Sequence, residues 1–101
     1  MRGITITYQY TGDEAEWKAT VGAFVAAINA DPRAKGRFTY QVAVADDGKT
    51  RIHWGRWDDA ETLAHVQAQS YFKAFAPKVQ DFAKGELSAT AHNILEKTSG
   101  W

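Results

Sequence analysis

The sequence predicts one α+β domain with the element order β-α-β-β-α-β. Residues 4–10, 37–45, 50–57 and 87–95 have the alternation or composition of strands. Between them lie two segments whose apolar residues recur at helical spacing. Elements in this order form the split-βαβ, ferredoxin-like antiparallel sheet, and this is the fold class that we expect.

The composition narrows the class of protein. A chain of 101 residues supports one core, so a single domain over residues 1–101 is expected. Twelve basic and twelve acidic residues give no net charge, which does not favour nucleic acid or a membrane as partner. The absence of cysteine excludes disulfides and thiolate metal sites. The first ten residues resemble a strand and not a signal peptide, and no segment is long enough to span a bilayer, so we expect a cytoplasmic protein.

The first strand and helix are clearly delimited. Asp13 predicts the N-cap of the helix, and Glu16 completes a capping box. Asp31 precedes Pro32, which disfavours helical backbone at Asp31 and ends the helix. The apolar faces consist of Ile4, Ile6, Tyr8 and Tyr10 on the strand and Trp17, Val21, Phe24, Val25 and Ile28 on the helix.

The helical spacing of apolar residues is interrupted once in the second helical segment. It begins after the Asp-Asp-Gly-Lys turn and the third strand, with Asp58 as the predicted cap and Glu61 as its partner. The step from Val66 to Phe72 is six residues, so the stripes before and after it point to opposite sides of one straight helix.

We therefore predict a break near Gln69 and Ser70, with Ser70 capping a second segment. Pro77 predicts a kink or another restart within that segment, and Gly85 predicts its end.

The two faces of the predicted sheet differ in character. We expect the helices to cover Ile4, Ile6, Tyr8, Phe38, Tyr40, Val42, Ile52, Trp54 and Leu87. The opposite face then carries Thr5, Thr7, Gln9, Thr39, Gln41, Ala43, His53, Trp57, Thr90, His92 and Ile94. This face has few charges for a solvated surface, which favours a homodimer with sheets packed face to face. The alternative is a monomer with a Thr-rich wet face.

The stretch "WGRWDD" followed by "ETLAHVQAQSYFKAF", taken with the element order, resembles the antibiotic biosynthesis monooxygenase superfamily. The resemblance is carried by Trp57, Asp58, His65, Ser70, Phe72 and Phe75. It implies a dimeric α+β barrel. The superfamily includes cofactor-free monooxygenases of phenolic compounds, haem-degrading enzymes, quorum-signal processing proteins and members of unknown role. The positions of the Trp and the iron-binding His of the haem-degrading branch are Val66 and Ala76 here, which argues against haem degradation by that mechanism and leaves haem binding through another His open. No cofactor is expected.

His65 is the candidate catalytic residue. Glu61 lies one turn before it and Gln69 one turn after it, and a His with a carboxylate partner is a general base near neutral pH. The alternative is an exposed pair on the helix surface. His53 and His92 are candidates to meet a ligand together with Trp57, or to satisfy each other in an interface. They are too few for a metal site, which normally needs three or four ligands.

Aromatic residues are the candidate ligand-binding residues. A mostly apolar cleft between helices and sheet could be lined by Tyr8, Phe24, Tyr40, Trp54, Trp57, Tyr71, Phe72 and Phe75. The alternative is that these rings only fill the core. The expected function is binding of a small apolar or aromatic molecule, with cofactor-independent monooxygenation as the implied reaction. A non-catalytic ligand-binding or accessory dimer, and a purely structural dimer, remain alternatives.

Overall fold

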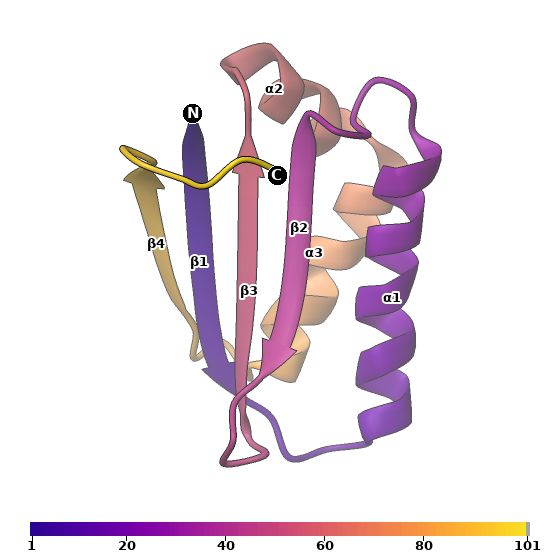
Figure 1. Cartoon of the computed structure of the whole chain (residues 1–101). Helices are drawn as coiled ribbons and strands as arrows, with labels where there is room; N and C mark the ends of the chain where they lie inside the picture. The colour runs from indigo at the N-terminus through magenta and orange to yellow at the C-terminus, as the bar shows by residue number, and fades with distance from the viewer. Residues whose placement is uncertain (101) are drawn as a thin grey trace.

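The computed structural model describes residues 1–100, and Trp101 lies outside them. The elements are β1 (Arg2–Gln9), α1 (Glu14–Ala30), β2 (Phe38–Val44), β3 (Thr50–Trp57), α2 (Ala60–Ala68), α3 (Ser70–Phe82) and β4 (Ser88–Asn93). This is the predicted order, with the second helix divided in two. The strands form one sheet in the order β2-β3-β1-β4, with every neighbouring pair antiparallel. Figure 1 shows the helices on one face of this sheet, which confirms the ferredoxin-like class.

The first half of the chain folds as its sequence predicts. Asp13 caps α1 by accepting hydrogen bonds from the amides of Ala15 and Glu16. The helix ends at Asp31, whose backbone is extended before Pro32. The side chains of α1 that are buried are Trp17, Val21, Phe24 and Ile28, all members of the predicted stripe.

The break in the second helical segment is confirmed, but the caps differ from the prediction. Asp59 is the N-cap of α2 and accepts the amide of Thr62, whereas Asp58 binds the side chain of Arg37. Asp59 is preferred because its carboxylate stands three residues before a free helical amide, while Asp58 still continues from β3. Gln69 has extended backbone and separates the two helices.

Ser70 is therefore the first residue of α3, and the prediction that it caps this helix is wrong. The helix also runs through Pro77 without a restart. Proline costs one hydrogen bond within the helix, and the burial of Phe75 and Val79 on either side holds the segment helical. The helix ends at Phe82, with Ala83 as its C-cap, three residues before the predicted Gly85. Gly85, at φ 75°, lies in the turn that follows, and its amide donates to the carbonyl of Gln80.

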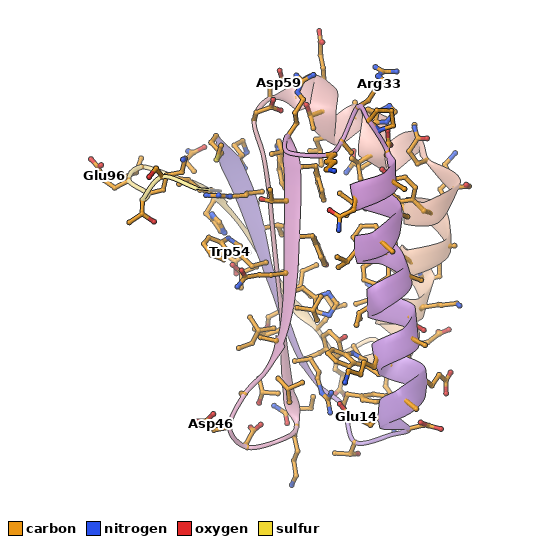
Figure 2. All side chains as sticks on the ribbon, turned by 45° about the vertical axis from the view of Figure 1, so that its right-hand side comes forward. Glu14, Arg33, Asp46, Trp54, Asp59 and Glu96 are labelled. Atoms are coloured by element: carbon orange, nitrogen blue, oxygen red, sulfur yellow. The ribbon has the colours of Figure 1, made fainter. Side chains whose placement is uncertain are left out.

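The residues of β3 that were predicted to face the helices, Ile52 and Trp54, face the other side, and their neighbours in the sequence face the helices instead. Ile6 of β1 and Val42 of β2 both stand opposite His53, and Phe38 stands opposite Trp57. Residues directly opposite each other share a face, so His53 and Trp57 point toward the helices. Trp54, conversely, points away from the helices, as Figure 2 shows.

The error has a physical origin. The helix-facing positions of β3 are Arg51, His53, Gly55 and Trp57, so apolar character does not mark the buried side of this strand. Arg51 is buried because its guanidinium pairs with Glu14 and lies 4.5 Å from the centre of the Trp17 ring. His53 is buried because two hydroxyls satisfy its nitrogens.

The other face of the sheet is not covered by a helix. One row across it consists of Gln41, Trp54, Thr5 and Thr90, which stand opposite one another on successive strands. The chain after β4 turns back over the end of β1 and β3 on this side (Figure 1). Leu95, in this segment, is 88% exposed. Within residues 1–100, no helix has the length and apolar character needed to cross a membrane.

Candidate functional site

His65 lies near the end of α2, where the loop after α1 meets the α2–α3 break. Its Nε2 is 2.7 Å from Oδ2 of Asp31, and its Nδ1 is 3.3 Å from the side-chain amide of Gln69. The carboxylate beside His65 is therefore not the predicted one, that of Glu61, but that of Asp31, which precedes His65 by 34 residues. Both side chains are largely buried, with exposed fractions of 11% for His65 and 14% for Asp31.

Asp31 collects three hydrogen bonds. Besides His65, the hydroxyl of Tyr71 donates to Oδ2 at 2.9 Å and the amide of Arg33 donates to Oδ1 at 3.0 Å. Burial opposes the charge of Asp31, but these hydrogen bonds outweigh it and hold the pKa of its carboxyl below the ordinary value. Burial and the neighbouring carboxylate together raise the pKa of Tyr71 to about 12. The group is thus an ordered His–Asp–Tyr cluster with an ionised aspartate.

A groove between α1 and α3 adjoins this cluster through Tyr71, while His65 itself lines a separate, small hollow with Arg33, Arg37, Glu61 and Thr62. The volume of the groove is about 150 Å³, and it is lined by Thr20, Ala23, Phe24, Tyr71, Ala74, Phe75 and Lys78. Its floor is the stacked pair of Phe24 and Phe75, whose ring centres are 4.0 Å apart at an angle of 4°. Tyr71 therefore belongs both to the apolar groove and, through its hydroxyl, to the polar cluster.

A second histidine lies behind that floor. His53 is fully buried, and its ring centre is 5.9 Å from that of Phe75. Its Nε2 is 2.8 Å from the hydroxyl of Tyr8, and its Nδ1 is 2.7 Å from the hydroxyl of Tyr40. The indole N–H of Trp17 donates to the same Tyr8 hydroxyl at 2.8 Å.

Burial sets the charge of this interior cluster, defined as Trp17, Tyr8, His53 and Tyr40. It lowers the pKa of His53 to about 4, so the imidazole is neutral at pH 7. Burial also raises the pKa of Tyr8, although the hydrogen bond from Trp17 acts in the opposite direction. The pKa of Tyr40 is raised as well, again chiefly by burial. The cluster is therefore uncharged, with both phenols protonated.

Gly55 fixes the position of Tyr40. The two residues stand opposite each other on β3 and β2. A Cβ atom on residue 55 would lie 3.0 Å from Cδ1 of Tyr40, closer than ordinary van der Waals contact. The tyrosine ring thus lies over the backbone of the neighbouring strand, and from there its hydroxyl reaches His53.

The structure brings together part of the predicted ligand-binding set. Tyr8, Tyr40 and Phe75 surround His53, and Phe24 packs against Tyr40 and Phe75. Tyr71 and Phe72 lie beside Phe24, with ring centres 6.0 and 6.3 Å away. Trp57 stacks on Phe38, away from this group, and Trp54 lies on the opposite face of the sheet. These rings fill the centre of the space between helices and sheet. Hollows remain at its margins, among them the groove between α1 and α3 and a hollow of about 260 Å³ between α1 and β2, which is lined by Val25, Ile28, Asn29, Gly36, Phe38, Thr39 and Tyr40.

His92 does not join His53. It lies on the uncovered face of the sheet, where its Nε2 is 3.2 Å from the hydroxyl of Thr5. The predicted meeting of the two histidines with Trp57 is therefore wrong, because β3 presents the other parity of residues. Within residues 1–100, no three side chains of His, Asp or Glu gather as a metal ion would require.

Asp31 and Trp17 are functional candidates that the sequence did not indicate. Asp31 was assigned only to the end of the helix, and Trp17 only to the apolar stripe. For Asp31 the sequence contains only a local signal, that an aspartate at a turn accepts a nearby amide, here that of Arg33, and this signal does not indicate His65. Trp17 offered a signal in its N–H, which needs an acceptor when the ring is buried.

Comparisons with known proteins identify the fold. No family model and no curated protein matches the sequence. Among solved structures, Rv0793 from Mycobacterium tuberculosis superposes with a TM-score of 0.77 at 14% identity, covering 97% of this chain and 98% of that one. A variant of SnoaB, a cofactor-independent oxygenase from Streptomyces nogalater, gives 0.76 at 13% identity, covering 98% and 97%.

A structure described as an antibiotic biosynthesis monooxygenase gives a TM-score of 0.73 at 11% identity. The superposition covers 95% of this chain and 100% of that one. Identities this low establish the fold and leave the activity open. The chain has the fold of the antibiotic biosynthesis monooxygenases, as the resemblance in its sequence predicted.

Proposed function

We propose that the protein binds a small aromatic molecule and oxidises it as a cofactor-independent monooxygenase. The observation that carries this proposal is the apolar groove that ends at Tyr71, whose hydroxyl is hydrogen-bonded to the Asp31 carboxylate that also holds His65. Apolar walls with a few convergent polar groups are typical of small-molecule sites. The same fold in SnoaB, a cofactor-independent oxygenase, supports the reaction class.

The size of the groove limits the ligand. A volume of about 150 Å³ is what an engineered cavity that binds benzene offers, so one aromatic ring fits. A larger ligand would insert one ring and leave the rest at the surface. Lys78 is the one charged side chain that lines the groove, and its position favours a ligand with an anionic or electron-rich substituent.

His65 is the proposed base. When its Nε2–H donates to Asp31, its Nδ1 carries the lone pair, and the amide of Gln69 at 3.3 Å is a long, weak competitor for it. Asp31 then stabilises the imidazolium that forms when Nδ1 accepts a proton. We expect the substrate to be an aromatic compound with an acidic CH₂ group. Loss of a proton to Nδ1 gives a carbanion that dioxygen oxidises, so that CH₂ and O₂ become C=O and H₂O.

Oxygen uptake with anthrone-type and quinol substrates tests the proposal. We expect His65→Ala to lower the rate at least about 100-fold, as loss of a general base does. His92→Ala is the matched control, because His92 lies on the other face of the sheet and should leave the rate unchanged. Uptake that is absent in a broad aerobic panel, or equal in both variants, would contradict the enzymatic function.

The protein is further proposed to be a homodimer. The uncovered sheet face is rich in Thr and carries Ile52 and Trp54, and a β-sheet face with β-branched and aromatic residues packs well against another sheet. Two-fold symmetric pairing is the commonest assembly of identical chains. Sedimentation should give twice the mass of the chain, and a monomer at high concentration would contradict the pairing.

A non-catalytic ligand-binding protein is the second candidate. The observation that favours it is that Phe24 and Phe75 stack directly between the groove and the interior, so the cleft between helices and sheet holds side chains instead of an open cavity. Ligand binding at the groove without oxygen uptake would select this function.

A further inference from the structure

The interior cluster contains more polar hydrogens than contacts that can receive them. Three contacts join Trp17, Tyr8, His53 and Tyr40 in a line. A neutral cluster has one N–H on Trp17, one on His53 and one O–H on each tyrosine. One hydroxyl hydrogen is therefore left without a place in the line, and the tautomer of His53 decides which tyrosine carries it.

Trp17 sets the direction at one end. An indole N–H can only donate, so the hydroxyl oxygen of Tyr8 must accept from it. The indole is itself held in place, because it is 5% exposed and its ring lies under the guanidinium of Arg51.

If His53 carries its proton on Nδ1, each group donates to the next. Tyr8 donates to Nε2, Nδ1–H donates to the oxygen of Tyr40, and the free hydrogen is that of Tyr40. Bonds aligned in one direction also polarise one another favourably.

If His53 carries its proton on Nε2, the oxygen of Tyr8 must accept from both Trp17 and His53. The hydrogen of Tyr8 then has no acceptor among residues 1–100, because the hydroxyl's contacts there are Trp17 and His53. Tyr8 is 4% exposed, and a buried donor without a partner costs about 1–3 kcal/mol. Tyr40 is only half-buried, so its hydrogen is the less costly one to leave free.

We infer that Trp17 and Tyr8 are positioning residues that hold His53 in the Nδ1–H tautomer, and that the hydroxyl of Tyr40 is thereby the hydrogen-bond donor that the interior presents to a bound molecule. The second part rests on the proposed function. The ring of Tyr40 packs edge-on against Phe24 and Phe75, 4.9 and 6.0 Å between centres, and these two rings line the groove. A ligand that displaces Phe75 meets this donor, so ligands with an acceptor oxygen, such as a ring-bound carbonyl, are preferred.

The tautomer is measured without any ligand, from the imidazole nitrogen resonances of ¹⁵N-labelled protein at pH 7. The signals of His53 are assigned by subtracting those lost in His65→Ala and His92→Ala. The wild type should show a protonated Nδ1 and an unprotonated Nε2. Trp17→Phe removes the donor that occupies one side of the Tyr8 oxygen. In the Nε2–H form the Tyr8 hydrogen can then turn to that side, so the tautomer ratio should shift toward Nε2–H, by about five-fold.

Tyr10→Phe is the matched control for these spectra. Tyr10 is a neighbouring tyrosine whose hydroxyl donates to the backbone of Asp13, outside the line, and its loss should leave the ratio unchanged. A wild-type His53 protonated on Nε2 would overturn the inference, and this result needs no variant. An unchanged ratio in folded Trp17→Phe would overturn the role of Trp17.

The ligand preference is tested with acetophenone and with ethylbenzene, which lacks the carbonyl. Tyr40→Phe should weaken acetophenone binding about five-fold and leave ethylbenzene binding unchanged. Equal effects on both probes would overturn the role of Tyr40. Binding of neither probe to the wild type would overturn that role together with the proposed function, while the tautomer would still decide the first part.

Discussion

His53 on β3 and His65 on α2 are two histidines in opposite environments. His53 lies in the middle of a strand, fully buried, with a phenol at each nitrogen. His65 lies near a helix end, at the rim of the fold, with a carboxylate at one nitrogen and a weak amide contact at the other. The first environment keeps the imidazole neutral, and the second places a carboxylate beside it. Proton transfer is therefore expected at His65, and structural order and ligand orientation at His53.

The largest effect that tests this contrast is the loss of the interior imidazole. His53→Ala removes a fully buried side chain and leaves the hydroxyls of Tyr8 and Tyr40 without their partner. We expect a loss of about 3–5 kcal/mol in the free energy of unfolding, measured in urea. His65→Ala should cost about 1 kcal/mol, since its site is partly exposed. Similar losses in the two variants would contradict the contrast.

The pH dependence of stability should also show that His53 is buried in its neutral form. The folded pKa of His53, about 4, lies below its ordinary value of 6.5, so between these pH values the unfolded chain binds a proton that the folded chain does not. Stability should therefore fall as the pH falls from about 6.5 to 4, by about 3 kcal/mol at 1.36 kcal/mol for each pH unit. Asp31, whose folded pKa is lowered, contributes stability that is lost only below its ordinary value of 3.8. Urea midpoints against pH measure both, and a His53→Gln variant should lack the upper phase.

The two tyrosines of the interior cluster should differ in importance. Tyr8→Phe leaves both the N–H of Trp17 and Nε2 of His53 without a partner, so we expect a loss of about 2 kcal/mol. Tyr40→Phe removes one partner of His53, and about 1 kcal/mol is expected. Thermal or urea unfolding compares them, with Tyr10→Phe as a control. A larger loss for Tyr40→Phe would contradict the view that Tyr8, with two contacts, is the more important tyrosine of the cluster.

The smallest effect on stability is expected at Tyr71, beside Asp31. Tyr71→Phe removes one of three hydrogen bonds to Asp31, and we expect a stability loss of about 0.5–1 kcal/mol. Because Asp31 keeps its bond to His65, oxygen uptake should fall less than in His65→Ala. A fall in uptake equal to that of His65→Ala would show that the reaction needs the Tyr71 hydroxyl as much as His65, which would contradict the lesser role of Tyr71.

The sequence predicted local features better than contacts across the fold. The cap at Asp13, the end of α1 before Pro32 and the break at Gln69 each depend on residues within a few positions, and each is confirmed. The face of β3 was predicted wrongly because Arg51 and His53 are buried polar residues, whose burial depends on partners in other elements. The strand's own pattern carries no sign of those partners.

The candidate site shows the same limit. Glu61 is the carboxylate nearest to His65 in sequence, but Asp31, 34 residues away, is its partner in space. The aromatic residues were predicted as one group, and the structure divides them between a packed interior, a surface groove and the opposite face of the sheet. Which of these a ring occupies depends on strand register, and the register is set by the pairing of all four strands.

The absent side chain at Gly55 has an evolutionary consequence. Because a Cβ atom there would lie 3.0 Å from Cδ1 of Tyr40, a larger residue requires the phenol ring to shift from the place where its hydroxyl meets His53. Positions 40, 53 and 55 should therefore change together in homologous sequences, with glycine retained wherever the Tyr–His pair is retained. This triplet gives a fingerprint for finding relatives that share the interior cluster, at levels of identity too low for overall similarity to reveal them.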